Sequence, residues 1–260
     1  MSLARFARLG PLCGSDATGT KSPLEAASRS KGRRQQNRRT VRVDIWSDLV
    51  CPWCYVGKRR FERALTAFPH ADQVEVVHRA YLLYPSSPRG TTFDRREVLM
   101  SKYRVSAGQA DALNANMVRT ASLEGLEYHL DGGVTGDTFD AHQVVHLARH
   151  RGLQDAVLER LYRAFFTEQR SIFDHVSLMD LGAEAGLARQ DVARALRENA
   201  YVQAVEADVE QAKTLGVNGV PFFVLDFRYG ISGAQQTDLF AEALTRAWQD
   251  AAAPPPGAHS

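Results

Sequence analysis

Cysteine is scarce in this sequence, with 3 among 260 residues. A secreted protein built on disulfides would carry more cysteines, and in even number. Long apolar runs are missing as well, since no stretch reaches the roughly 18 apolar residues that a membrane-spanning helix needs. The N-terminal segment lacks the apolar core of a secretory signal, because glycine, proline and polar residues interrupt it. These absences predict a cytoplasmic protein with no membrane partner.

A strong net charge is also absent, since the formal charge is +2, and no nucleic-acid partner is expected on that ground. The charge is unevenly placed, because residues 1–40 hold nine Lys or Arg and two acidic side chains. That segment is rich in Ser, Gly and Arg without apolar periodicity, which predicts a disordered basic tail. A transit peptide and a nucleic-acid-binding arm are the alternative interpretations. Residues 251–260, with three prolines, predict a second disordered tail.

Between the tails, residues 41–250 predict a single α/β domain. Apolar and polar residues alternate over 41–45, which indicates a strand. A helix should follow over 52–68, because a proline opens it and Pro69 stops it. Residues 74–83 predict a second strand. A strand–helix–strand unit of this kind implies that the two strands are parallel.

The second predicted strand is followed by a long block of helical patterns. The expected helices cover residues 93–105, 106–123, 139–150, 153–167, 176–185, 191–199 and 201–215. Two short strands over 221–225 and 230–232 and an amphipathic helix over 237–248 should then close the fold. The order therefore predicts a sheet-forming part, about 41–84 and 200–250, that encloses a helical insertion, about 91–199.

Two of the three cysteines stand in Cys51-Pro52-Trp53-Cys54, at the start of the first predicted helix. A C-x-x-C pair beside a strand–helix–strand unit is typical of a thioredoxin-like redox site. The unsatisfied N–H groups and the dipole of the helix start favour the thiolate of Cys51, which makes it the expected nucleophile. Cys54 lies one turn further and is the expected resolving thiol. Pro52 stiffens the turn, and Trp53 is expected to offer the substrate an apolar contact.

Other chemistry is less well supported by the residues. C-x-x-C is also a zinc spacing, but a closed zinc site needs four ligands and the third cysteine, Cys13, lies in the predicted tail. Two inert buried thiols would leave the proline at the helix start unexplained. His142, His146 and His150 share one helical face without a supporting carboxylate or cysteine. We therefore predict no metal site.

A second feature lies far from the motif in sequence. Gly219-Val220-Pro221 directly precedes a buried strand whose interior would not tolerate proline. The proline therefore indicates a tight turn, compatible with a cis peptide bond. In a thioredoxin-like sheet this turn would face the start of the C-x-x-C helix. The backbone at Val220 is then expected to pair with an extended substrate segment, which makes Val220 and Pro221 candidate substrate-binding residues.

These segments together resemble a known family. Residues 44–57, which contain the C-P-W-C motif, resemble the active-site segment of the DsbA family of thiol–disulfide oxidoreductases, in its FrnE-like branch. Residues 219–223 resemble that family's cis-proline strand and residues 232–235 the turn after it. Residues 138–142 resemble a signature of the helical insertion, although Asp137 and Gln143 depart from its usual Asn and Arg. No extra cysteine pair near the C-terminus, as some members carry, is present.

The resemblance covers about residues 41–248 and implies a thioredoxin-like fold with a large all-helical insertion between the βαβ and ββα halves. It also implies that Cys51 and Cys54 are the redox dithiol, that Pro221 is the cis-proline and that Val220 precedes it. Relatives resembling kappa-class glutathione transferases and chromene-carboxylate isomerases carry Ser at the first cysteine position. Cys51 argues against their glutathione-dependent chemistry.

The sequence thus predicts an oxidoreductase that exchanges disulfides with protein or small-molecule thiols, as a monomer or homodimer. We expect no bound cofactor, with glutathione as a redox partner. A reducing cytoplasm favours reductase or isomerase activity over bulk oxidation. Two alternatives are a glutathione-dependent isomerase or transferase acting on a small aromatic or polyketide-like compound, and a holdase-like binding protein whose apolar groove matters more than its thiols.

Overall fold

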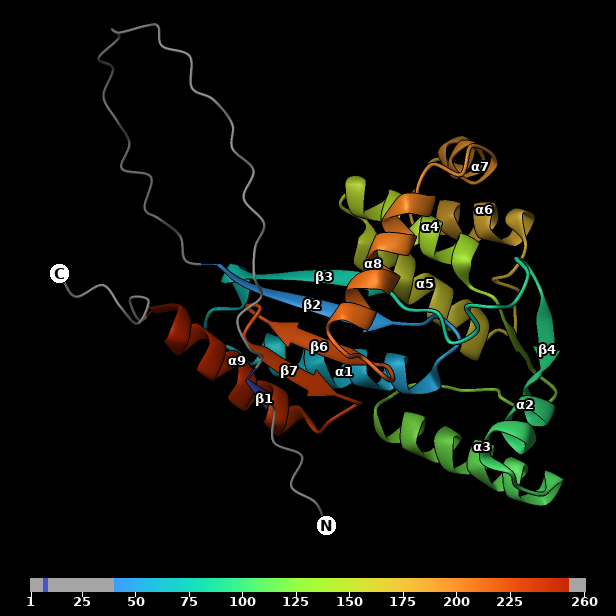
Figure 1. Ribbon diagram of the computed structural model, residues 1–260, viewed down its shortest axis with the longest axis horizontal. Helices are drawn as coiled ribbons and strands as arrows, with labels where there is room; N and C mark the ends of the chain where they lie inside the picture. The colour runs from blue at the N-terminus through green and yellow to red at the C-terminus, as the bar shows by residue number, and fades with distance from the viewer. Residues whose placement is uncertain (1–6, 9–39, 253–260) are drawn as a thin grey trace, which may run out of the picture.

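A five-stranded sheet organises the protein, which a computed structural model describes over residues 7–8 and 40–252 (Figure 1). The strand order is β1-β7-β6-β2-β3. The strands are β1 (Ala7–Arg8), β2 (Val41–Ser47), β3 (Val74–Ala80), β6 (Phe222–Leu225) and β7 (Tyr229–Ser232). Helix α1 (Pro52–Thr66) and the short 3-10 helix Ala71–Gln73 connect the parallel pair β2 and β3, whereas β6 and β7 are antiparallel to their neighbours.

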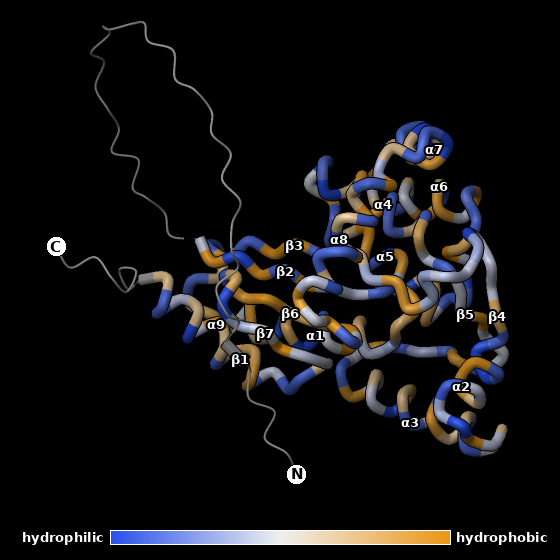
Figure 2. The backbone as a smooth tube through the Cα atoms, in the orientation of Figure 1, coloured by the Kyte–Doolittle hydropathy of each residue, from blue (hydrophilic) through white to orange (hydrophobic). Residues whose placement is uncertain are grey.

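Different helices cover the two faces of the sheet. Successive side chains of β2 point to opposite faces, so each face has its own buried cluster. Val43 and Ile45 are buried in a cluster with Phe61 of α1 and Phe240 of α9 (Thr237–Ala252). Trp46 points to the other face, where it is buried beside α8 (Val202–Thr214). Figure 2 shows the apolar stretches along the central strands, enclosed by helices of mixed polarity. The sheet is therefore a buried middle layer.

A group of helices between β3 and β6 covers the end of the sheet where β2 terminates (Figure 1). These helices are α2 (Arg95–Tyr103), α3 (Ala107–Leu123), α4 (Phe139–His150), α5 (Gln154–Phe166), α6 (His175–Glu184) and α7 (Arg189–Arg197). Their core is continuous with the start of α1, since Cys54 and Tyr55 belong to the same buried cluster as Leu158 and Phe166. The insertion is thus packed directly on the C-x-x-C segment.

The fold class predicted from the sequence is confirmed, with βαβ and ββα halves around a large insertion. The insertion is helical except for a two-stranded antiparallel sheet, β4 (Thr92–Asp94) with β5 (Val134–Gly136). The helix predicted over 93–105 consequently begins at Arg95, where the Asp94 side chain accepts a hydrogen bond from the Glu97 amide. Gly136 permits this pairing, because a Cβ there would lie 2.1 Å from the Thr91 carbonyl oxygen.

Residues 7–8 and 40 are the described part of the segment over 1–40 that the sequence predicts to be a disordered tail. Residues 7–8 form β1, which pairs antiparallel with β7. An edge strand exposes unused backbone donors and acceptors, and such an edge accepts a further strand from any sequence able to extend. The tail predicted over 251–260 starts too early, because α9 continues through Ala251 to Ala252, and residues 1–6, 9–39 and 253–260 lie outside the described part of the chain. None of the described helices combines the length and apolar content needed to cross a membrane.

Candidate active site

The C-x-x-C segment forms the N-terminus of α1. Pro52 is the first helical residue, a position where its missing N–H costs no hydrogen bond. Cys51 is the N-cap, with extended backbone angles and no side-chain capping bond. The Cys51 amide donates to the Asp48 carbonyl at 3.1 Å, and the Cys54 amide donates to the Cys51 carbonyl at 3.0 Å. The Cys51 sulfur therefore lies at the positive end of α1.

The turn before β6 lies against this sulfur. The peptide bond between Val220 and Pro221 is cis. The Cys51 Sγ atom donates to the Val220 carbonyl at 3.6 Å, although the two residues are 169 positions apart. Gly57 of α1 allows the close approach, because a Cβ there would lie 2.8 Å from Pro221 Cγ. The structure thus brings together Cys51, Val220 and Pro221, all of which the sequence singled out.

The two thiols are free and have different surroundings. Cys51 is 6% exposed and Cys54 is 2% exposed. Burial, and then the hydrogen bond and charge of Cys51, raise the pKa of the Cys54 thiol well above its ordinary value, and a backbone hydrogen bond at Asp48 opposes this only in part. The raised pKa favours the protonated thiol form of Cys54 over its thiolate.

Trp53, the third member of the motif, is 44% exposed beside these buried thiols. It is one of the few large apolar side chains in the described residues that face solvent. The Pro52 carbonyl, by contrast, accepts a hydrogen bond from the Tyr128 hydroxyl at 2.8 Å. The motif therefore presents one apolar side chain outward while its backbone is fixed by the insertion.

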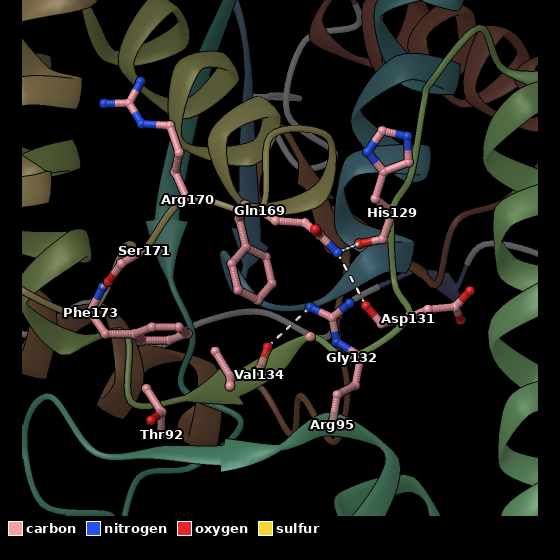
Figure 3. Close-up of a pocket in the computed structure, with 12 residues that line it drawn as sticks. Thr92, Arg95, His129, Asp131, Gly132, Val134, Gln169, Arg170, Ser171 and Phe173 are labelled. Carbon is pink, nitrogen blue, oxygen red and sulfur yellow. Dashed lines mark hydrogen bonds between the residues drawn. The ribbon is translucent and has the colours of Figure 1, made fainter.

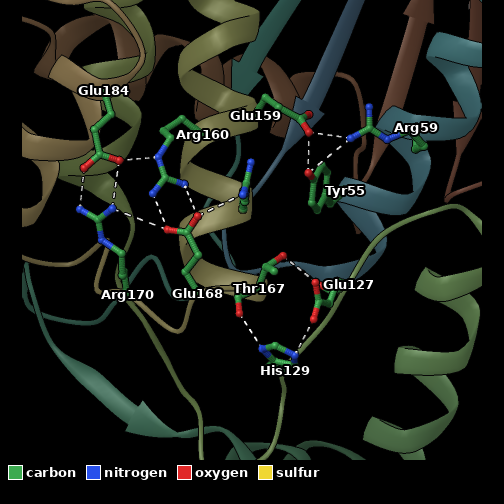
Figure 4. Close-up of polar contacts among 11 residues, drawn as sticks. Tyr55, Arg59, Glu127, His129, Glu159, Arg160, Thr167, Glu168, Arg170 and Glu184 are labelled. Carbon is green, nitrogen blue, oxygen red and sulfur yellow. Dashed lines mark hydrogen bonds and ion pairs between the residues drawn. The ribbon is translucent and has the colours of Figure 1, made fainter.

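Behind the motif lies a stack of aromatic rings that sequence reasoning did not identify as part of the site. Tyr55 stacks on Tyr162 with 4.8 Å between ring centroids, and Tyr128 stacks on Phe166 at 4.7 Å. The Tyr55 hydroxyl donates to Glu159 at 2.5 Å, and Glu159 also pairs with Arg59 at 2.6 Å (Figure 4). These contacts join α1 to α5, and their sequence separation of about a hundred residues leaves no local signal.

Asp48 is a second functional candidate that the sequence did not reveal. Its side chain is fully buried just before the motif. One carboxylate oxygen accepts from the Thr138 hydroxyl at 2.8 Å and the Val50 amide at 3.3 Å, and the other accepts from the Leu83 amide at 2.6 Å. His142 Nε2 lies 3.9 Å from this carboxylate. Asp48 thereby ties the loop that carries Cys51 to the insertion.

The three histidines on one face of α4, His142, His146 and His150, contact different residues. His142 and His146 are buried, and His146 Nε2 lies 2.9 Å from an oxygen of Asp208. The His150 ring lies 5.5 Å from that of Tyr201. Within residues 40–252, no three His, Cys, Asp or Glu side chains are gathered as a metal site would require. Cys13, the remaining cysteine, lies outside the described residues.

Comparison with known proteins gives a consistent set of relatives. The family model for the DSBA-like thioredoxin domain matches residues 42–245. A crystal structure of a probable DsbA oxidoreductase from Streptomyces coelicolor is 45% identical, covering 85% of this chain and 94% of its own, with a TM-score of 0.79. An uncharacterised Bacillus subtilis protein, YwbO, is 28% identical over 79% of this chain and 96% of its own.

A more distant solved structure shares the fold. It is the cytosolic disulfide reductase DsbM from Pseudomonas aeruginosa with glutathione, at 21% identity and a TM-score of 0.55. The match covers 79% of this chain and 98% of that protein.

Proposed function

Because the chain belongs to the DSBA-like thioredoxin domain family of thiol–disulfide oxidoreductases, we propose that it reduces or isomerises disulfides through Cys51 and Cys54. One observation carries this proposal. The Cys51 sulfur lies at the start of α1 and 3.6 Å from the Val220 carbonyl, with Cys54 one turn further along the helix. A thiolate at a helix N-terminus is equipped to attack a disulfide, because the helix start favours the charged form of the sulfur.

The first step forms a mixed disulfide. The Cys51 thiolate attacks one sulfur of the substrate disulfide, the substrate S–S bond breaks, and a Cys51–substrate bond forms. The departing substrate sulfur leaves as a thiolate and takes a proton from solvent. We assign substrate binding to the Val220 backbone and Pro221, because they lie opposite Cys51. Exposed Trp53 supplies an apolar surface for the same substrate.

The second step releases the substrate. Cys54 loses its proton and attacks the Cys51 sulfur, which forms the Cys51–Cys54 disulfide and frees the second substrate thiol. Two electrons have then passed from the dithiol to the substrate. Two glutathione thiols return these electrons and become glutathione disulfide, which restores the dithiol. In isomerisation the mixed disulfide is instead attacked by another thiol of the substrate.

The direction of exchange follows from the proposed compartment. We propose that the protein works in the cytoplasm, where the glutathione pool is poised at about −220 to −320 mV. Disulfides are rarely formed for structural purposes there, so reduction or isomerisation is the useful direction. We further propose that it belongs to the FrnE-like branch, that it acts without a bound cofactor, and that it acts on protein or small-molecule disulfides with no nucleic-acid or membrane partner.

The two cysteine variants test this proposal together. Cys51→Ser should abolish disulfide exchange, because the attacking sulfur is lost. Cys54→Ser should accumulate a mixed disulfide between Cys51 and the substrate, detected by mass under non-reducing conditions. If neither variant traps a substrate while both retain exchange activity, the proposal is wrong. If activity instead needs glutathione and survives Cys54→Ser, the glutathione-dependent isomerase or transferase alternative takes its place.

A further inference from the structure

Asp48 is a buried carboxylate that has no part in the reaction steps described above. Its two oxygens accept hydrogen bonds from the Thr138 hydroxyl and from the amides of Val50 and Leu83. All three donors are neutral, and among the described residues no Lys or Arg side chain pairs with this carboxylate at 4.0 Å or less. An ionised carboxylate only accepts hydrogen bonds, which suits this set of donors. A buried charge is costly unless it is paired, so an unpaired carboxylate at this position calls for a reason.

His142 of α4 is the ionisable side chain closest to this carboxylate. Its Nε2 atom lies 3.9 Å from Asp48 Oδ1, which is longer than a hydrogen bond. The ring is buried, and Nε2 has no hydrogen-bond partner. At this distance the ring does not form the charge-assisted hydrogen bond that would cancel the negative charge of Asp48.

Thr138 connects the Asp48 carboxylate to the start of α4. Thr138 is the N-cap of this helix, a position where a threonine side chain ordinarily accepts a hydrogen bond from an amide of the first turn. It makes no such capping bond, and its hydroxyl donates to Asp48 at 2.8 Å instead. The insertion therefore uses a hydroxyl that could stabilise its own helix to hold the carboxylate beside the motif.

The loop that Asp48 holds is the one that ends at the nucleophile. Asp48 Oδ1 lies 3.3 Å from the amide nitrogen of Val50, the residue directly before Cys51. The Asp48 carbonyl accepts the Cys51 amide at 3.1 Å. The side chain and the backbone of Asp48 thus both contact the turn that carries the Cys51 sulfur.

The charge of Asp48 acts on the groups around the dithiol. Burial is the main cause of the raised pKa of Cys54, the hydrogen bond and charge of Cys51 follow, and the charge of Asp48 acts in the same direction. Burial also raises the pKa of Tyr84 and of Tyr162, and the charges of Asp48 and Cys51 add to both effects. The carboxylate and the two sulfurs therefore share one weakly screened region, in which like charges repel.

We propose that Asp48 makes the dithiol more reducing, because its carboxylate opposes a thiolate on Cys51 or Cys54, and that Thr138 is the positioning residue for this charge. The inference rests on the proposed disulfide exchange. Reduction of the Cys51–Cys54 disulfide takes two electrons and two protons, or one proton where one sulfur stays ionised. A neighbouring negative charge disfavours the ionised dithiol and leaves the neutral disulfide unaffected, so the dithiol gives up its electrons more readily.

Asp48→Asn removes the charge and keeps the shape of the side chain. Its oxygen still accepts from Leu83, and its NH₂ group at the Oδ1 position has Thr138 Oγ1 and the unpartnered His142 Nε2 as possible acceptors. In glutathione buffers the equilibrium of the full-length variant should shift about tenfold toward the dithiol, which makes it about 30 mV less reducing. Alkylation of free thiols, read by mass, measures the shift.

The release step gives a second readout, which a purely structural role of Asp48 would not change. Without the Asp48 charge the Cys54 thiolate forms more readily, so the mixed disulfide should decay about threefold faster near pH 7. The curve of decay rate against pH should also move to lower pH. Quenched-flow measurement on the original protein and on Asp48→Asn compares the two curves.

Thr138 is tested by variants that keep or remove its hydroxyl, and these also test the charge if Asp48→Asn does not fold. Thr138→Val should shift the glutathione equilibrium toward the dithiol by about threefold, because the carboxylate loses a donor that favours its ionised form. Thr138→Ser retains the donor and should stay within about twofold of the original protein. Thr92→Val is the matched control, because Thr92 is an exposed residue of β4 that lines the cavity shown in Figure 3. It should leave the equilibrium unchanged.

The outcomes separate this inference from the proposed function. Adding Thr138→Val to Asp48→Asn should change the equilibrium by less than about twofold, because the hydroxyl acts through the carboxylate. Variants that lose stability in urea but keep the original equilibrium and pH curve overturn the inference and make Asp48 a structural residue. An effect of Asp48→Asn that Thr138→Val does not share overturns the role of Thr138. An original protein without any dithiol–disulfide transition in glutathione buffers overturns the proposed function itself.

Discussion

Cys51 and Cys54 are three positions apart, and their sulfur atoms have different surroundings. Cys51 caps the start of α1, where its sulfur meets the helix dipole and the Val220 carbonyl. Cys54 is buried inside the first turn, and that burial raises the pKa of its thiol. These surroundings support the proposed roles of Cys51 as the attacking thiol and of Cys54 as the resolving thiol.

The raised pKa of Cys54 predicts how the release step depends on pH. Only the thiolate attacks a disulfide, and a thiol with a raised pKa is almost entirely protonated near neutral pH. Decay of the mixed disulfide should therefore accelerate as pH rises, by up to about tenfold per unit below that pKa. Quenched-flow measurement of the mixed disulfide between about pH 6 and pH 9 checks this. A decay rate that does not change over this range would show that Cys54 deprotonation does not limit release.

Gly57 predicts a steric effect on the site. A Cβ at this position would lie 2.8 Å from Pro221 Cγ and 3.4 Å from Ala234 Cα. Gly57→Ala should displace the Pro221 turn from Cys51, destabilise the protein by about 1–3 kcal/mol and slow exchange by about tenfold. Urea unfolding and steady-state reduction of a small disulfide measure the two effects.

Gly108 provides the control for this substitution. It lies in α3, and a Cβ there would meet nothing within 4 Å. Gly108→Ala should leave exchange unchanged and stabilise the protein by up to about 1 kcal/mol through helix propensity. Equal exchange rates in the two alanine variants would mean that the approach of Pro221 to α1 does not matter for activity.

At the scale of elements, one residue, Asp208, connects four of them through its carboxylate and its main-chain carbonyl. Asp208 of α8 accepts from Arg79 of β3 at 2.8 Å and from the Ala80 amide at 3.0 Å. His146 of α4 lies 2.9 Å from the same carboxylate. The Asp208 carbonyl accepts from the Trp46 indole of β2 at 2.9 Å. This residue therefore fixes α8 and the insertion to the sheet.

Asp208→Asn should destabilise the protein by about 2 kcal/mol, because it weakens the buried charge-assisted hydrogen bonds to Arg79 and His146, although Arg79 keeps its pairing with Asp44 at 2.8 Å. Burial acts to raise the pKa of Asp208, but the hydrogen bonds from His146 and Ala80 and the charge of Arg79 outweigh it and lower the pKa. A lowered pKa contributes stability that is present above the unfolded value, about 3.9, and is lost as pH falls through the folded value.

The difference in stability between the original protein and Asp208→Asn should therefore be largest near neutral pH and shrink below about pH 4. Urea unfolding at several pH values measures it. Glu210→Gln, two residues along α8 at an exposed position paired with Lys213, should change stability by less than about 0.5 kcal/mol. A pH-independent difference for Asp208→Asn would contradict the assignment of a buried, paired charge.

Local patterns account for what the sequence predicted well. Helix α4 begins and ends at the expected residues, and the helix predicted over 106–123 is α3, whose start is fixed by a capping box of Ser106 and Gln109. The motif and the turn at Pro221 were identified because proline and cysteine carry strong positional information. These features depend on residues within a few positions of one another.

Features that depend on distant contacts were not predictable in this way. The β4–β5 pairing joins segments about forty residues apart and has no apolar alternation over its short strands. Asp48, Arg95 and Asp208 resemble ordinary surface charges in the sequence, and their burial follows from packing between elements. The structural role of a buried charged residue can be recognised only from the three-dimensional positions of the groups around it.

At the scale of the whole molecule, the dithiol lies where the sheet-forming part meets the insertion. The start of α1 is buried against the insertion through Tyr128 and Tyr162, while the turn at Val220 approaches it from β6. The segment that carries the dithiol is thus held in place by both parts of the fold.

The equilibrium between the dithiol and disulfide forms of Cys51 and Cys54 in glutathione buffers tests this account most directly. Alkylation of free thiols, read by mass, and Trp53 fluorescence report the two forms. The account predicts one reversible two-electron transition at the reducing end of the range, about −270 mV. A transition near about −120 mV would contradict the reductase direction. Two thiols that stay free at every glutathione ratio would contradict the redox function itself.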